Sequence, residues 1–127
     1  MEINIITGQI IDTSIQLHRT LGPGLLESVY EKCLEVDLRE KGFEVVSQLG
    51  VPLKYKNLEF NTGYRLDLLV ENQVIVEVKS VETLAPVHFS QLLTYLKLYD
   101  KRVGLLINFN SKYLKQGLHR IVNKYED

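Results

Sequence analysis

The chain has 127 residues, of which 45% are hydrophobic and 24% charged, and its formal net charge is −1. This balance is that of one globular domain with a single core, and it excludes a disordered or collagen-like chain. A charge so close to zero also excludes a molecule-wide basic field that would gather nucleic acid without specificity, so any phosphate contact must be local. We therefore treat residues 1–127 as a single domain.

Cysteine content and hydropathy restrict the class of protein further. The lone Cys33 excludes a disulfide framework and a cysteine-bound zinc or iron–sulfur site within one chain. No apolar run is long enough to cross a bilayer, and the opening residues M-E-I-N-I-I-T-G lack the basic segment of a signal peptide. We expect a cytoplasmic protein that does not contact membranes.

The chain opens with helical spacing of apolar residues. This spacing predicts a first helix over about residues 4–20, ended by the sequence L-G-P-G. A second helix is predicted from about Pro23 to Lys41, where Gly42 provides a C-terminal stop.

From residue 43 the pattern changes to alternation, which is typical of strands. Three strands are predicted, over residues 44–55, 58–70 and 74–79. Helical spacing then returns over residues 86–100, an apolar strand follows at 102–109, and we expect a short helix over 114–124. The main elements follow the order ααβββαβ, which predicts an α/β fold with a mixed four-stranded sheet flanked by helices.

The loop between the second and third strands determines which side chains face one another. A two-residue loop at 71–72 would place Asp67 and Glu77 on opposite faces of the sheet. A three-residue loop at 71–73 instead places them directly across from each other and lines up apolar residues, Leu66 and Leu68 among them, on one continuous face. Hydrophobic matching therefore favours the longer loop.

Two carboxylates about 5 Å apart on neighbouring strands repel each other unless a cation lies between them. Oxygen ligands suit Mg²⁺ or Mn²⁺, and Lys79 on the same face can orient an attacking water or stabilise charge on a phosphate. The alternative is a cross-strand salt-bridge ladder of Asp67, Arg65, Glu77 and Lys79 on a solvated face. The spacing alone leaves both interpretations open.

The spacing of these residues resembles a known motif. Asp67, nine intervening residues and then Glu77-Val78-Lys79 have the form of the PD-(D/E)XK nuclease superfamily, in which an acidic residue on one strand precedes (D/E)-x-K on the next. Leu66 stands where the proline that names the superfamily would be. The resemblance implies a restriction-endonuclease-like core and metal-dependent hydrolysis of phosphodiester bonds.

Two further stretches resemble members of that superfamily. Q-L-L-T-Y at residues 91–95 is similar to the Q-x-x-x-Y element of RecB-like nucleases. G-L-L-E-S-V-Y at residues 24–30 matches the signature of the small bacterial GxxExxY proteins. Because these stretches follow the family in order, the resemblance extends over nearly the whole chain.

The resemblance also implies roles for individual residues. The implied ligands of a Mg²⁺ or Mn²⁺ ion are Asp67, Glu77, the backbone carbonyl of Val78 and Glu27. The implied catalytic residues are Lys79, Glu27, Gln91 and Tyr95. Substrate contact is implied for Arg65 and His88. The implied substrate is nucleic acid, with DNA favoured. A non-catalytic nucleic-acid-binding or protein-interaction module with the same fold is the alternative, and RNA as substrate, endo or exo cleavage and homodimer formation stay open.

Overall fold

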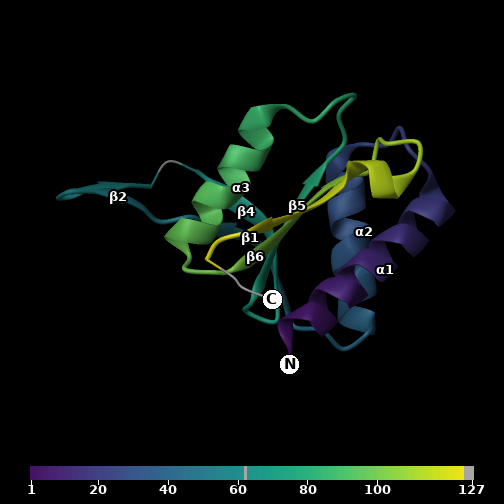
Figure 1. Ribbon diagram of the computed structural model, residues 1–127, viewed down its shortest axis with the longest axis horizontal. Helices are drawn as coiled ribbons and strands as arrows, with labels where there is room; N and C mark the ends of the chain where they lie inside the picture. Colours follow the sequence, from purple (N-terminus) through teal and green to yellow (C-terminus); the bar gives the residue numbers. More distant parts are fainter. Residues whose placement is uncertain (62, 125–127) are drawn as a thin grey trace.

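The computed structural model describes residues 1–61 and 63–124, which form a sheet with helices on both faces (Figure 1). Helices α1 (Ile3–Leu21) and α2 (Glu27–Glu40) pack on one face, and α3 (Pro86–Leu98) packs on the other. Two apolar clusters result, one under each helical layer. Within the described part of the chain, no helix combines the length and the apolar composition needed to cross a membrane.

The main sheet has five strands in the order β1-β4-β5-β6-β7. Their bounds are Val45–Gly50 (β1), Arg65–Val70 (β4), Val74–Lys79 (β5), Val103–Asn108 (β6) and Leu118–Val122 (β7). Only β5 and β6 are parallel, and α3 forms the crossover between them. The α/β class and the mixed sheet flanked by helices are therefore confirmed.

The first predicted helix is confirmed, but the second begins four residues later than predicted. Gly22 and Gly24 both have positive φ, 71° and 100°, which a continuing helix cannot contain. The side chain of Tyr30 holds this turn, because its hydroxyl donates to the carbonyl of Gly22 and accepts from the N–H of Leu25. Helix α2 therefore starts at Glu27.

The predicted helix over residues 114–124 is wrong. Only Leu114–Gly117 is helical, as a single 3₁₀ turn, and the chain then enters β7. Strand β7 runs antiparallel to the fully buried β6 and pairs with it from Val103 to Ile107. Without that partner, the backbone N–H and C=O groups along one side of β6 would lack hydrogen bonds, so the sheet has five strands and not four.

The two longest predicted strands each divide in two. Pro52, which cannot donate to a ladder, separates β1 from β2 (Leu53–Tyr55), and a break after β3 (Leu58–Phe60) separates it from β4. Strands β2 and β3 pair only with each other, around a turn in which Lys56 has φ 54°. They form a hairpin that projects from the body of the molecule (Figure 1).

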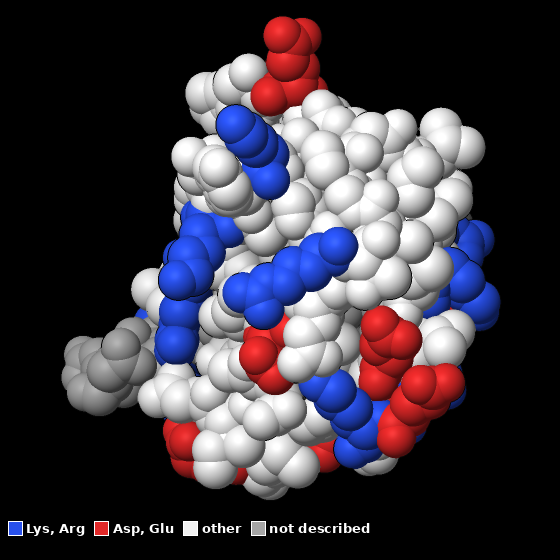
Figure 2. Space-filling model, turned by 90° about the vertical axis from the view of Figure 1, so that its right-hand side faces the viewer, with Lys and Arg blue, Asp and Glu red and all other residues white. Residues whose placement is uncertain are grey.

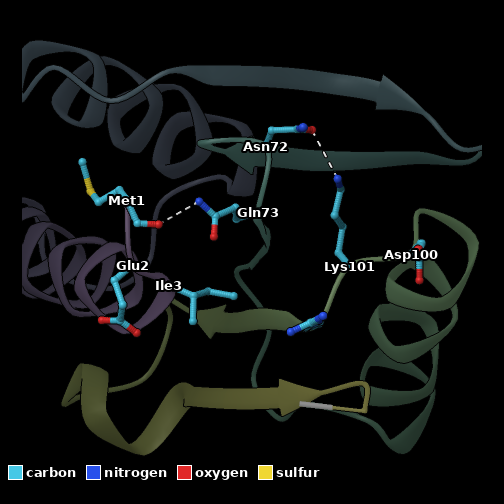
Figure 3. A pocket seen from close by; sticks show the side chains of 8 residues that line it. Met1, Glu2, Ile3, Asn72, Gln73, Asp100 and Lys101 are labelled. Carbon is cyan, nitrogen blue, oxygen red and sulfur yellow. Dashed lines mark hydrogen bonds between the residues drawn. The ribbon is translucent and has the colours of Figure 1, made fainter. Parts of the chain in front are cut away.

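The predicted three-residue loop between β4 and β5 is confirmed. Val70 pairs with Val74 and Leu68 with Val76, the register that the longer loop requires. Glu71 and Asn72 both adopt positive φ in this turn. A cavity of about 380 Å³ lies beside it (Figure 3), where the Gln73 amide donates to the carbonyl of Met1 and thereby ties the N-terminus to the turn.

We expect Gly104→Ala to lower the free energy of unfolding by about 1–3 kcal/mol, the usual cost of overpacking a core. A β-carbon at Gly104 in β6 would lie 2.9 Å from the side chain of the buried Leu92, so the glycine allows α3 to approach the sheet. Urea denaturation measures the change.

The matched control is Gly8→Ala in α1, where a β-carbon meets nothing within 4 Å. Removing a helix-interior glycine there is expected to raise the stability by up to about 1 kcal/mol. Equal stability of Gly104→Ala and the parent protein would contradict the close packing of α3 on β6.

Candidate functional site

The main sheet opens into a fork between β4 and β5. Their ladder has only three pairs, Val70 with Val74, Leu69 with Ile75 and Leu68 with Val76. Beyond it, β4 continues beside β1 as far as Arg65, and β5 continues beside β6 as far as Lys79. The two halves of the sheet separate at the point where Asp67 and Glu77 face each other.

At the fork, the side chains of Asp67 and Glu77 replace backbone carbonyls as hydrogen-bond acceptors. The N–H of Asp67 donates to Oε2 of Glu77 at 2.7 Å, and the N–H of Val78 donates to Oδ2 of Asp67 at 2.8 Å. Each carboxylate thus accepts a strand N–H that no longer has a partner in the ladder. Glu77 is buried, with 3% of its surface exposed, and Asp67 is half-buried.

Strand β4 is distorted at Asp67. Leu66 packs in the cluster under α3, whereas Leu68 packs in the cluster under α1 and α2, so the continuous apolar face predicted for them is wrong. On β1, Gln48 lies opposite Asp67 but has φ 51° and drops out of the ladder. The distortion accounts for a polar residue between two fully buried leucines, because it directs the Asp67 side chain into the fork.

The electrostatics of the fork oppose two negative charges. Burial raises the pKa of Asp67, and the nearby Glu31 raises it further. Burial and then the charge of Asp67 raise the pKa of Glu77. Lys79 lowers both pKa values, but within the described residues its ammonium forms no ion pair or hydrogen bond. Neither carboxylate therefore forms an ion pair with a described residue, although Lys79 lies close enough to act on both.

The salt-bridge ladder is wrong for the same reason. The ion pairs among the described residues are Lys32–Glu35, Arg39–Glu35 and Lys41–Asp12. The guanidinium of Arg65 instead donates to the carbonyl of Gln48, at 3.4 Å. Since Glu77 is buried, its face of the sheet is not solvated.

Helix α2 brings Glu27 to the end of β5. Oε1 of Glu27 accepts the N–H of Ser80 at 3.2 Å, and the Ser80 hydroxyl donates to the carbonyl of Leu25 at 2.7 Å. Tyr30, which is stacked on Phe109 at 4.8 Å between ring centroids, holds the turn that precedes this glutamate. The tyrosine of the G-x-x-E-x-x-Y stretch therefore positions its glutamate.

Glu31 is a fourth carboxylate at the fork, in addition to those predicted from the sequence. The amide of Gln48 donates to Oε2 of Glu31 at 2.7 Å and to Oδ1 of Asp67 at 3.5 Å, which links the helix to the strand. The available signal was its spacing, because Glu31 follows Glu27 by four residues and so lies one turn further along the same helix face.

On the other face of the sheet, α3 brings Tyr95 to the fork. Burial raises the pKa of Tyr95 to about 12, with contributions from the charges of Glu77 and Asp67, so its hydroxyl stays protonated. Gln91 lies close enough to Tyr95 to lower that pKa slightly, and both side chains line the same cavity. The side chain of His88 interacts with the start of the helix instead, where its Nδ1 accepts the N–H of Ala85.

Basic residues near the C-terminus are divided between two places on the described surface. Lys112 and Lys115 line a cavity of about 720 Å³ with Arg19, near the end of α1. Arg120 donates to Asn4 at the beginning of α1, roughly 20 Å away along the helix. Figure 2 shows the side of the molecule on which α1 lies, with Lys and Arg side chains in a band and Asp and Glu among them.

A family model described as the PD-(D/E)XK nuclease superfamily matches residues 4–121. The chain belongs to the PD-(D/E)XK nuclease superfamily. The matched span includes both fork carboxylates, Lys79 and all of α3. Comparisons with curated proteins and with solved structures found no match. Membership of the GxxExxY proteins stays a prediction from residues 24–30.

PD-(D/E)XK nucleases are typically metal-dependent, and the fork is the place where carboxylates of this chain meet. In residues 1–61 and 63–124, no group of three or more His, Cys, Asp or Glu side chains is arranged to hold an ion. Mg²⁺, however, is usually bound by one or two carboxylates, with waters and substrate phosphates completing its shell. Asp67 and Glu77, which face each other across the fork and form no ion pair with a described residue, fit such a site, and their oxygen donors suit Mg²⁺ or Mn²⁺.

The raised pKa values predict how stability depends on pH in EDTA. Because the folded protein holds the protons of Asp67 and Glu77 more tightly than the unfolded chain does, stability falls as the pH rises above the ordinary carboxyl range. We expect Glu77→Gln to weaken this fall in stability, because the amide does not titrate. The fold should persist, since the amide oxygen can still accept the N–H of Asp67. Thermal melts between pH 5 and 8 measure it.

The matched control is Glu82→Gln, which changes an exposed carboxyl outside the fork. We expect it to reproduce the pH dependence of the parent protein. Parallel melting curves for the parent and Glu77→Gln would contradict uncompensated burial of charge at the fork.

Proposed function

We propose that the chain is a Mg²⁺- or Mn²⁺-dependent phosphodiesterase that hydrolyses nucleic acid, with DNA the favoured substrate. The observation that carries this proposal is the pair of carboxylates in the fork, the half-buried Asp67 and the buried Glu77, which form no ion pair with a described residue. An uncompensated buried pair costs stability, and a divalent cation removes that cost.

The proposed ligands are the side chains of Asp67 and Glu77 and the backbone carbonyl of Val78. A bound divalent cation neutralises the carboxylates and polarises a phosphate oxygen. Glu27 lies next to them through its bond to Ser80, and its second carboxylate oxygen has no hydrogen bond among the described residues. We assign that oxygen to the metal's outer shell or to the attacking water.

Lys79 is the proposed catalytic cation. It ends β5, two residues beyond Glu77, and its ammonium is not engaged elsewhere in the described protein. In hydrolysis a water oxygen forms a bond to phosphorus, the bond to the leaving sugar oxygen breaks, and that oxygen takes a proton. The ammonium orients the water and stabilises the negative charge that develops on the phosphate oxygens.

The remaining residues are assigned to the substrate. Arg65, exposed at the start of β4, is proposed to contact a phosphate. Tyr95, whose hydroxyl remains a donor, and Gln91 beside it are proposed to position the substrate backbone. His88, at the first turn of α3, is proposed to contact a more distant part of the strand.

A binding module is the second candidate, and one observation favours it. Each fork carboxylate already accepts a strand N–H, which is a structural use that needs no metal. A protein that kept the fork only to shape the sheet would bind a partner without hydrolysing it.

We expect Lys79→Ala to abolish cleavage and yet to keep the rise in melting temperature caused by Mg²⁺, because the metal ligands remain. Glu77→Ala is expected to lose both, since it removes a ligand. In EDTA near neutral pH, Glu77→Gln should be no less stable than the parent, because the mutual repulsion is relieved while the N–H of Asp67 keeps an acceptor. Melting curves with Mg²⁺ or EDTA, beside plasmid and oligonucleotide cleavage assays, test these outcomes.

The control is Lys97→Ala, which removes an exposed charge of α3 and should cleave like the parent. Metal-independent melting of the parent, together with no cleavage of DNA or RNA, would refute the nuclease and leave the binding module.

A further inference from the structure

A cavity of about 320 Å³ adjoins the fork, between the hairpin side of the sheet and α3. Leu53 of the hairpin and Tyr64, just before β4, form one wall. Val87, Thr94 and Leu98 of α3 form the other wall. Unlike the cavity beside Met1, it lies toward the fork, because its lining includes Tyr95 of α3 and Tyr64, which directly precedes β4.

We propose that this cavity binds one unpaired base of the substrate strand, next to the phosphate that lies in the fork. The inference rests on the proposed function and specifies its substrate: a single-stranded or frayed strand, not a continuous duplex.

The chemistry of the lining suits a nucleobase. Its lining has two tyrosine rings, those of Tyr64 and Tyr95, and several aliphatic side chains, which can enclose the flat faces of a heterocycle. The amide of Gln91 and the hydroxyl of Thr94 add donors and acceptors that can bind the edge of the base. In a duplex that edge is paired and the faces are stacked, so only an unpaired base can enter.

The residues that line the cavity show that it neighbours the fork. Tyr95 lines the cavity, and the charges of Glu77 and Asp67 both act on its hydroxyl. Tyr64, which also lines the cavity, directly precedes β4 and stands three residues before Asp67 in the chain. A base in the cavity would therefore belong to a nucleotide adjacent to the reacting phosphate.

The charge around the cavity favours a polyanion over a second copy of the chain. Residues 51–65 carry Lys54, Lys56 and Arg65 against the single Glu59, although the whole chain is slightly negative. The phosphates on either side of a bound base would find these cations. Two copies of the chain meeting here would instead bring like charges together.

The hairpin extends the same surface. By strand pairing, Leu53 lies opposite Phe60 and Tyr55 opposite Leu58, so one face of the hairpin is apolar and aromatic. Tyr55, Leu58 and Phe60 are exposed. Neighbouring unpaired bases can stack along this face, which requires no sequence preference.

The test is binding of fluorescein-labelled oligonucleotides to the full chain, measured by anisotropy with Ca²⁺ in place of Mg²⁺ so that the strand stays intact. We expect the single strand to bind more tightly than the same sequence as a duplex. Thr94→Trp, which fills the cavity from α3, should weaken single-strand binding about tenfold, the effect of losing one stacked base. Thr20→Trp, the same change at an exposed site of α1, should have no effect.

A second pair of variants guards against misfolding. Tyr64→Ala should weaken single-strand binding about tenfold, whereas Tyr64→Phe keeps the ring and should bind like the parent. Melting curves of all four variants confirm that they fold. Equal binding of single strand and duplex, or unchanged binding by both Thr94→Trp and Tyr64→Ala, would overturn the inference.

The experiments distinguish failure of the proposed base site from failure of the proposed nuclease activity. Metal-dependent cleavage with neutral cavity variants would keep the nuclease and refute the base site. Cavity-dependent binding of single strands without cleavage would keep the base site and refute the nuclease. A dimer in analytical ultracentrifugation that Thr94→Trp dissociates, with strand binding unchanged, would assign the cavity to a second copy of the chain and so refute the base site.

Discussion

The arrangement of the site depends on two reciprocal hydrogen bonds, from the N–H of Asp67 to Glu77 and from the N–H of Val78 to Asp67. They join β4 and β5 at the point where the backbone ladder ends. The strands can therefore separate without leaving these buried N–H groups unpaired. The same bonds hold two carboxylates in a position that burial and mutual repulsion disfavour, and a protein tolerates such strain mainly at functional sites.

The helices place the other polar groups around that fork. Helix α2 begins at the turn held by Tyr30, which brings Glu27 to the end of β5, and one turn later Glu31 reaches Asp67 through Gln48. Helix α3 packs closely over Gly104 and brings Tyr95 to the opposite side. The helices on both faces of the sheet thus position polar side chains at the same fork.

The sequence predicted the centre of the site better than its surroundings. The alternating apolar pattern and the three residues at 71–73 sufficed for the register that sets Asp67 against Glu77, because both are local properties. They did not suffice for β7, whose residues became a strand because β6 offered an unpaired edge. Nor did they predict the distortion at Asp67, which separates Leu66 and Leu68 into different clusters.

The sequence by itself determined the α/β class, the turn and register of β4 and β5, and the carboxylate–carboxylate–lysine motif of a PD-(D/E)XK nuclease. These features depend on periodicity, turn residues and motif spacing, which are all properties of short stretches of chain. Only the tertiary structure decided that the carboxylates are buried without an ion pair, that Glu31 joins them, and that Tyr64 and α3 enclose a cavity beside them. Each of these depends on contacts between segments far apart in the chain, and packing, not local preference, sets such contacts.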